Sequence, residues 1–302
     1  MKMPSGENRD KALFILNPHA GVQPVNFIIS RDLERRKEDL LCRKTQDIQA
    51  TRDLIEQNRN NHKVIVAAGG DGTVHSVATQ LVCTDKILGV LPLGSGNGFA
   101  REFGFKMNIR SLLSNIEKGE SMCIDMIEIN GNMCLNVAGI GLDSFVAHSF
   151  NNLKLRGFLP YIWLTFKTFV QLRPFHVNIR SEGRSLFSGK LFVLTFANTR
   201  QFGNNAFIAP DARPNDGMMN IVMVKPFPKV LGPVFAIRLF TKKINNSRYV
   251  ETLTTEKEIV IDTDEKRFHI DGEPLEISET VTVRLRKNVL KVLKTPYNKF
   301  LS

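Results

Sequence analysis

A turn made of glycine, aspartate and threonine, Gly69-Gly70-Asp71-Gly72-Thr73, follows the apolar run Val64 to Ala68 and precedes a helical pattern. Glycines let a backbone come close to a phosphate group, and the N–H groups at a helix N-terminus attract anions. An acid inside such a turn is unusual unless a metal ion or a substrate hydroxyl needs it. A tight strand-to-helix turn capped by Asp71 is the structural alternative. The density of glycine and acid in five positions favours a phosphate site.

A second glycine-rich turn, Gly94-Ser95-Gly96-Asn97-Gly98, follows the apolar run Ile87 to Leu91. Two such turns at the carboxyl end of one parallel sheet would form a nucleotide crevice. The common nucleotide signatures do not fit. Gly189-Lys190 is followed by Leu191 and not by Ser or Thr, and Phe99 stands where a dinucleotide fingerprint needs its third glycine. The protein-kinase triplets H-R-D and D-F-G are also absent from the sequence.

Further acids lie in the second half of the chain. Asp271-Gly272-Glu273 follows the short apolar run Phe268 to Ile270, and its two carboxylates could serve a metal ion and accept a proton. Asp-Gly is also a hairpin signal, so a plain turn is the alternative. The presence of the two glycine-rich turns in the same chain favours a functional site. A hairpin at Asn130-Gly131 would set Asp125 opposite Asn136, where a cross-strand hydrogen bond competes with a metal role. The histidines, His75 among them, are interpreted as structural.

Alternating strands and helices must position the glycine turns. The patterns predict strands at 12–16, 40–43, 64–68 and 87–91, with helices at 46–58, at 74–82 and near Phe99. Strands that alternate with helices indicate a parallel sheet covered by helices on both faces. The first half is therefore predicted to be an α/β nucleotide-binding domain with a parallel sheet.

The second half changes to short strands with few helical patterns between them. They are expected at 123–129, 133–137, 175–181, 190–197, 219–224, 258–263, 268–270 and 281–286. Such a series is typical of an antiparallel β-sandwich. The domain boundary is expected near residues 120–130.

Composition limits the partners and the compartment. The formal net charge is +11 and the pI about 9.6, which suits an anionic partner or a solvated basic surface. The four cysteines show no metal spacing and are expected to be reduced thiols. The polar N-terminus lacks a signal core, and the apolar run from 158 to 172 is shorter than the roughly 20 residues of a spanning helix. A soluble, cytoplasmic protein is expected.

The motifs N-P-x-x-G, G-G-D-G-T, L-P-x-G-S-G-N and D-G-E occur here in the order of the diacylglycerol kinase catalytic family, which includes soluble bacterial lipid kinases and is related to sphingosine and ceramide kinases. The sequence resembles that family from Ala12 to about Leu293. The resemblance implies use of ATP and Mg²⁺. It also implies three parts: a nucleotide-binding domain at 8–125, a β-sandwich lipid-substrate domain at 126–288, and a segment at 289–302 that returns to the first domain.

The same resemblance assigns roles to single residues. ATP contacts are implied for Asn17, Thr45, Gly69, Gly70, Asp71, Gly72, Thr73, Ser95 and Asn97. A magnesium–water network is implied for Asp125. A structural Mg²⁺ loop is implied for the Asp216 carboxylate with the backbone carbonyls of Arg213 and Met218, and a lipid head-group contact for Asp143. Catalysis falls to Asp71, Asp271 and Glu273, and the sequence does not decide whether Asp71 or Asp271 is the base.

The function implied is an ATP-dependent lipid kinase that phosphorylates a hydroxyl of a diacylglycerol-like or sphingoid lipid. The apolar stretch Leu153 to Leu172 is interpreted as an acyl-chain tunnel or lid, with a core helix as the alternative. An NAD-kinase-like enzyme and a non-catalytic lipid-binding regulator are the rival functions. Peripheral contact with a membrane is expected and a nucleic-acid partner is not. A homodimer is left open.

Overall fold

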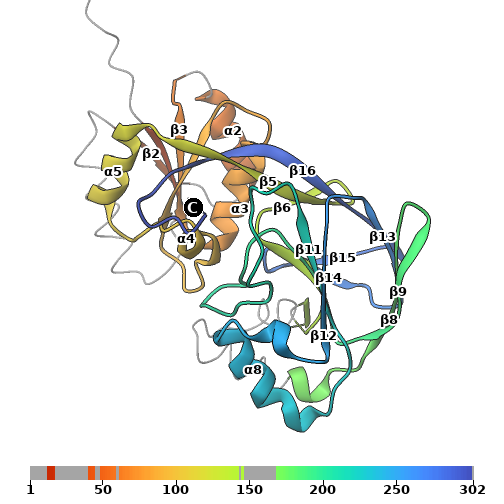
Figure 1. Ribbon diagram of the computed structural model, residues 1–302. Coiled ribbons are helices and arrows are strands. Elements are labelled where there is room, and N and C mark those ends of the chain that lie inside the picture. Colours follow the sequence, from red (N-terminus) through yellow and green to blue (C-terminus); the bar gives the residue numbers. More distant parts are fainter. Residues whose placement is uncertain are drawn as a thin grey trace, which may run out of the picture.

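The computed structural model describes residues 12–17, 40–44, 48–58, 61–142, 144–145 and 168–300. Its two halves share one long sheet, and a second sheet lies against the C-terminal part of the first (Figure 1). Among the residues described, no helix is long and apolar enough to cross a membrane.

The N-terminal half is built on four parallel strands in the order β2-β1-β3-β4. They are β1 (Ala12–Leu16), β2 (Leu40–Lys44), β3 (Val64–Gly69) and β4 (Ile87–Pro92). Every residue of β1, β3 and β4 is buried, as expected for parallel strands with both faces covered. The predicted parallel sheet is confirmed.

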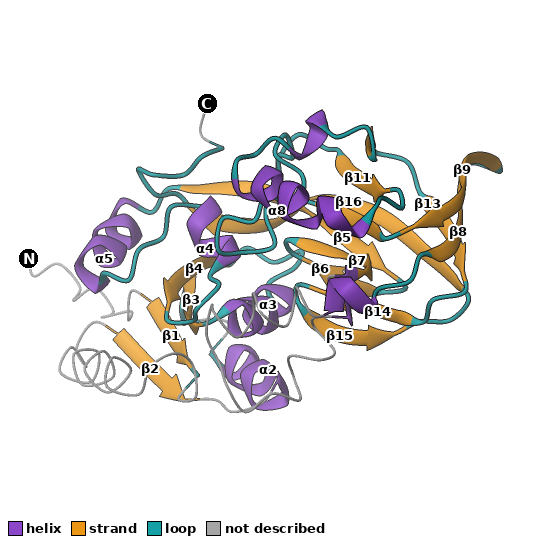
Figure 2. Ribbon diagram, turned by 90° about the horizontal axis from the view of Figure 1, so that it is seen from below, coloured by secondary structure: helices purple, strands orange, loops and turns teal. Residues whose placement is uncertain are grey.

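Helices cover this sheet on both faces. They are α2 (Ile48–Gln57), α3 (Asp71–Gln80), α4 (Gly98–Glu102) and α5 (Ile109–Lys118). Figures 1 and 2 place α2 and α3 together on one face and α5 on the other. The sequence patterns did not predict α5, although it has a regular start and end: the Asn108 side chain accepts a hydrogen bond from the Ser111 N–H, and Gly119 closes the helix in a left-handed conformation.

The C-terminal half is an antiparallel β-sandwich, as predicted. One layer continues the long sheet through β5 (Ser121–Ile129), β6 (Asn132–Cys134), β8 (Phe175–Ser181), β9 (Arg184–Leu191), β13 (Ile259–Thr263) and β16 (Thr280–Leu293). The other layer has the order β12-β11-β10-β7-β14-β15. These strands are β7 (Val137–Gly141), β10 (Val193–Ala197), β11 (Met219–Val224), β12 (Val250–Thr255), β14 (Arg267–Ile270) and β15 (Glu273–Glu276).

A single apolar core fills the space between the two layers. Ile127, Ile261 and Val283 contribute to it from the long sheet, and Ile140, Phe196 and Phe268 from the second sheet, and all are fully buried. The second sheet is also covered on its outer face by the helix α8 (Gly232–Phe240) and by two short 3-10 helices, η1 (Lys229–Leu231) and η2 (Ile244–Asn246).

Two strands run without a break from one half into the other. β5 pairs along its length with β16, and the last residues of β16 pair in parallel with β4, Lys291 with Ile87 and Val292 with Leu88. The predicted limits at 125/126 and 288/289 both fall inside these continuous strands, so the three-part division stays a prediction. The two strands fix the position of one half against the other.

Candidate active site

The first glycine turn connects β3 to α3. Gly70 is the residue before the helix, and no side chain caps it, so the first N–H groups of α3 lack a side-chain acceptor there. Gly69 has no room for a side chain, because an added Cβ would lie 2.3 Å from Thr73 Oγ1. Asn17, at the end of β1, donates its amide to the same Thr73 oxygen at 3.2 Å. The turn therefore holds Asn17 and Thr73 together at the carboxyl edge of the sheet.

The second glycine turn packs directly on the first. A Cβ on Gly94 would lie 2.6 Å from the Gly70 Cα. Asn97 takes a left-handed conformation, and its side chain closes the turn, accepting from the Gly94 N–H at 3.0 Å and donating to the Gly94 carbonyl at 2.7 Å. Ser95 is exposed. Neither Ser95 nor Asn97 lines the cavity described below.

Asp71 connects the two turns. Its carboxylate lies beside Gly96, where an added Cβ would be 2.9 Å from Asp71 Oδ2. Burial raises the pKa of Asp71 to about 6, and the charge of Asp271 acts in the same direction, against the lowering effect of backbone N–H groups of Phe99, Gly98 and Asn97. Asp71 thus faces the start of α4, and a pKa near 6 lets it exchange a proton close to neutral pH.

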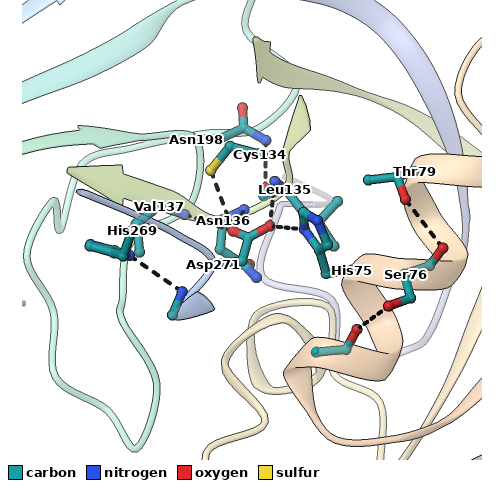
Figure 3. Close-up of polar contacts among 12 residues, drawn as sticks. His75, Ser76, Thr79, Cys134, Leu135, Asn136, Val137, Asn198, His269 and Asp271 are labelled. Carbon is teal, nitrogen blue, oxygen red and sulfur yellow. Dashed lines mark hydrogen bonds and ion pairs between the residues drawn. The ribbon is translucent and has the colours of Figure 1, made fainter. Parts of the chain in front are cut away.

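Asp271 lies in the hairpin turn between β14 and β15, with φ of +52° at Asp271 and +87° at Gly272. Its side chain is 1% exposed. Oδ1 accepts from the N–H groups of Asn136 (2.7 Å) and Val137 (3.2 Å), and Oδ2 from that of Leu135 (2.8 Å). The Cys134 thiol also donates to Oδ1, at 3.4 Å (Figure 3). The hairpin turn expected at Asp271-Gly272 as the structural alternative is present. The Asp271 carboxylate fixes the backbone between β6 and β7.

His75 completes this cluster from the other half of the molecule. Its Nδ1 lies 2.7 Å from Asp271 Oδ2 (Figure 3). Burial works to raise the pKa of Asp271, but the His75 hydrogen bond and charge and the backbone N–H groups hold it below its ordinary value. Burial works to lower the pKa of His75, but Asp271 and the charge of Glu273 raise it. The pair joins α3 to the β14–β15 turn.

A cavity of about 840 Å³ lies between the two halves. The N-terminal half lines it with Asn17, Gly70, Gly72, Thr73 and His75, among others, and the C-terminal half with residues that include Asn132, Ile270 and Glu273. Glu273 is exposed, and its Oε1 would lie 2.9 Å from a Cβ on Gly72. This volume suits a ligand of nucleotide size, and the ionisable groups that line it, His75 and Glu273, come from both halves.

A second acidic cluster lies apart from the residues that line this cavity. Asp125 is buried, and its carboxylate accepts from the N–H groups of Gly217 and Asn288, both at 2.8 Å. Asp125 therefore makes no cross-strand bond to Asn136, whose side chain accepts instead from Thr199. The Asn130-Gly131 hairpin is confirmed, with Ile129 opposite Asn132.

Asp216 accepts from the Met218 N–H at 3.0 Å, and burial raises its pKa, with the charge of Asp125 adding to the effect. The Arg213 charge acts on Asp216 in the opposite direction. Two neighbouring carboxylates suit a hard metal ion, which prefers oxygen ligands. Within the described part of the chain, no three His, Cys, Asp or Glu side chains are grouped for a metal. The predicted set at Asp216 has one carboxylate with the backbone carbonyls of Arg213 and Met218, and it stays a prediction.

Some predicted residues lie outside the described residues. Thr45, Asp143 and the segment 153–167 are among them. His75, in contrast, was interpreted as structural, and the structure brings it to the cavity. Its position four residues after Asp71 would have set both on one face of α3, and that spacing was the available signal.

Comparison with known proteins shows two family matches that together cover most of the chain. Residues 11–129 match the model of the diacylglycerol kinase catalytic domain, and residues 136–294 match that of the YegS C-terminal NAD kinase beta sandwich-like domain. The diacylglycerol kinase of Bacillus subtilis is 29% identical over 230 residues, which are 74% of this chain and 75% of that protein.

Two further matches cover almost the whole chain. A Pseudomonas fluorescens protein named probable lipid kinase YegS-like is 28% identical over 290 residues, 93% of this chain and 94% of its own. A crystal structure of a Bacillus anthracis diacylglycerol kinase superposes with a TM-score of 0.68 at 20% identity, covering 95% of this chain and 97% of that one. At that identity the superposition establishes the fold alone.

Proposed function

The chain belongs to the diacylglycerol kinase catalytic domain family, and from this we propose that it transfers the γ-phosphoryl group of ATP to a hydroxyl of a membrane lipid. Family membership makes it a kinase with an alcohol acceptor. The observation that carries the proposal is the cavity in which the Gly69–Thr73 turn faces the Asp271–Glu273 turn. Phosphoryl transfer needs donor and acceptor held in line more than covalent chemistry, and a cavity between two fixed halves suits that need.

In this proposal the N–H groups at the start of α3 bind the ATP phosphates, and Asn17 and Thr73 hold the turn that presents them. Mg²⁺ bound with ATP would neutralise phosphate charge, and Glu273 is the carboxylate placed to hold it in the cavity. Asp125 is proposed to act with the Asp216 loop, because its carboxylate is bound to that loop and to β16.

Asp71 is the better candidate for the proton acceptor. A base must lie near the lipid hydroxyl and take its proton. Both carboxylates accept from backbone N–H groups, and neither is among the described residues that line the cavity, but Asp271 is also paired with His75. The pKa of Asp71 is raised to about 6, whereas that of Asp271 is lowered, so Asp71 is the stronger base of the two. We assign Asp271 the role of orienting His75 and holding the two halves in position.

A panel of acceptors tests the proposed function. The wild-type protein is incubated with γ-labelled ATP and Mg²⁺ together with diacylglycerol, sphingoid bases, ceramide or NAD. Label in the organic phase, as a phosphorylated lipid, is the expected result. Label in NADP would instead support the NAD-kinase-like alternative. That alternative is tested because the family matched by the C-terminal half is described as NAD kinase beta sandwich-like. No turnover of any acceptor would favour a non-catalytic lipid-binding protein.

The contact between the two glycine turns predicts a difference between two small substitutions. A Cβ on Gly94 would collide with Gly70, whereas one on Gly70 would make only an ordinary contact of 3.4 Å with Gly94. Gly94→Ala should therefore separate the turns and weaken ATP binding by at least about tenfold, or roughly 1.4 kcal/mol. Gly70→Ala should weaken it less. Calorimetric titration of both folded variants with ATP measures this, and equal losses would contradict the packing argument.

The Asp216 loop predicts a metal effect. Asp216→Ala removes the carboxylate of the proposed Mg²⁺ loop, so the variant should contain less bound Mg²⁺ by elemental analysis and should unfold at a lower temperature in Mg²⁺ buffer. When a chelator removes Mg²⁺, the unfolding temperatures of wild type and Asp216→Ala should lie closer together than they do in Mg²⁺ buffer. Equal metal content in wild type and variant would remove Asp216 from the proposed site.

A further inference from the structure

The helix α8 exposes apolar side chains where a surface helix normally has polar ones. Val230, just before it, is 81% exposed, and Val234, Ile237 and Phe240 are 45%, 62% and 45% exposed. Their spacing of four, three and three places them along one side of the helix. An apolar strip of this kind marks a contact surface more often than a free one.

The opposite side of α8 is fixed to the sandwich. Leu231, Phe235 and Leu239 pack on the core under the outer face of the second sheet. At the start of the helix, a Cβ on Gly232 would lie 2.6 Å from the Phe169 ring. Lys229 donates to the carbonyls of Phe169, Val170 and Leu172 at 2.6–2.7 Å. The exposed strip is therefore held outward on a helix packed on both the sheet and the 168–172 segment.

The segment that carries α8 is basic, and two carboxylates from outside it contact it: Glu251 pairs with Lys225, and Asp211 accepts from Asn245. The sequence from 217 to 250 contains no Asp or Glu and six basic residues: Lys225, Lys229, Arg238, Lys242, Lys243 and Arg248. Within the described part of the chain, no carboxylate lies within ion-pair distance of Arg238, Lys242 or Lys243. Lys242 and Lys243 are exposed and directly follow the helix. Lys242 lies over the Phe207 ring at 4.7 Å but makes no ion pair among the described residues. Apolar residues beside cations that make no such ion pair suit a surface that is both apolar and anionic.

Val170 extends the strip. It is 55% exposed, and its carbonyl accepts the Lys229 bond at 2.6 Å. It lies near the end of the apolar stretch that the sequence suggested as the path of the acyl chain. The exposed strip and the end of that stretch are thus neighbours on one surface, at the lower edge of the molecule in Figure 1.

We propose that the exposed strip of α8, with Val170 beside it and Lys242 and Lys243 at its end, docks the protein on an anionic lipid bilayer. The apolar side chains enter the headgroup boundary, and the lysines contact lipid phosphates. This inference rests on the proposed function in one respect: docking would bring the cavity to a membrane-bound substrate.

The test is cosedimentation of the full-length protein with two kinds of vesicle. One contains phosphatidylglycerol and phosphatidylcholine in equal parts, and the other phosphatidylcholine alone. The double substitution Val234→Asp and Ile237→Asp should reduce binding to anionic vesicles by about tenfold or more. Met107→Asp is the matched control, because Met107 is also exposed (57%) but precedes α5 in the other half. It should bind as wild type does.

A second set of variants tests the lysines. Replacing Lys242 and Lys243 by Gln should weaken binding to anionic vesicles and leave the weak binding to neutral ones unchanged. Added salt should act in the same direction, because screening shortens the field to about 8 Å at physiological ionic strength. Because all substituted residues are exposed, the unfolding temperatures should stay close to that of wild type.

Three results would overturn the proposal. The first is unchanged vesicle binding by the α8 double variant, and the second is equal binding of wild type to anionic and neutral vesicles. The third is a smaller molecular mass of the variant than of wild type in solution, measured by light scattering, without a loss of vesicle binding. The last would assign this face to a second copy of the chain. Activity separates this inference from the proposed function: the α8 variant should keep the wild-type rate on a short-chain lipid in solution and lose rate on vesicles. Vesicle binding through α8 without kinase activity would leave docking intact and refute the kinase.

Discussion

Replacing Asp71 by Asn should lower kcat by about 10²- to 10⁴-fold, the range that a positioned general base contributes. Asparagine keeps the shape of the side chain and the acceptor that faces the start of α4, but it cannot take a proton. ATP affinity should change little, because the phosphates are proposed to contact backbone N–H groups and not this carboxylate. Single-turnover kinetics and calorimetry, measured on the same protein, separate the two quantities.

The pH dependence gives this prediction a second readout. Because the pKa of Asp71 is about 6, wild-type kcat/KM should rise with pH through about 6 as the carboxylate ionises. The residual rate of Asp71→Asn should lack that rise. Asp85→Asn is the control, since Asp85 is exposed beyond the end of α3 and should behave as wild type. A full rate in Asp71→Asn, or an unchanged pH profile, would exclude Asp71 as the base.

The ionisation of Asp71 that raises the rate should at the same time lower the stability of the folded protein. A carboxyl group whose folded-state pKa lies above its ordinary value of about 3.9 destabilises the native state once it is ionised. Stability from this group therefore falls as pH rises from about 4 to about 6. Asp71→Asn removes this ionisation cost but also replaces an acceptor of the Phe99, Gly98 and Asn97 N–H groups. Its unfolding temperature relative to wild type should therefore rise between pH 4 and pH 8. A difference that does not change with pH would contradict the raised pKa of Asp71.

Replacing Asp271 by Asn should destabilise the protein by several kcal/mol and abolish most of the activity. The Asp271 carboxylate accepts from three backbone N–H groups and from His75. An amide presents one NH₂ group to these donors, and each buried donor left without an acceptor costs about 1–3 kcal/mol. Total stabilities of about 5–15 kcal/mol make such a loss large. Urea unfolding of both proteins measures it.

Glu273→Gln is the matched control for folding, because Glu273 belongs to the same turn but is exposed. Its stability should stay within about 0.5 kcal/mol of wild type. The lowered pKa of Asp271 means that its contribution to stability is present above about pH 3.9 and is lost as pH falls further. The raised pKa of His75 means that its contribution is present below about pH 6.5 and is lost as pH rises through the raised value. The loss in Asp271→Asn should be greatest between these limits, and a pH-independent loss would contradict the ion pair.

Local patterns were sufficient to predict much of the fold. The parallel sheet follows from apolar runs between glycine turns, and the Asn130-Gly131 hairpin from its two residues. α5 and α8 were missed. The apolar residues of α8 lie on both of its sides, so the sequence gives no polar face by which to recognise a surface helix.

The site was predictable only in part, because its contacts join distant segments. The two glycine turns could be placed at one sheet edge from their positions after strands. The donors to Asp271, in contrast, come from residues 134–137 and from His75, separated from it by more than a hundred positions. No local pattern shows which groups this carboxylate accepts from. The proposal of Asp71 rather than Asp271 as the base rests on such contacts and on the opposite pKa shifts of the two acids. The same holds for Asp125, whose bonds to Gly217 and Asn288 tie it to the Asp216 loop.

The central claim is that the protein phosphorylates a lipid hydroxyl at the cavity between its halves, and the product tests it most directly. Wild-type protein, ATP and Mg²⁺ are incubated with a total lipid extract, and the lipids are analysed by mass spectrometry against an incubation with Asp71→Asn. We predict a lipid that gains one phosphate with wild type and stays unmodified with the variant. Consumption of ATP without a phosphorylated lipid, or equal product from both proteins, would contradict the account.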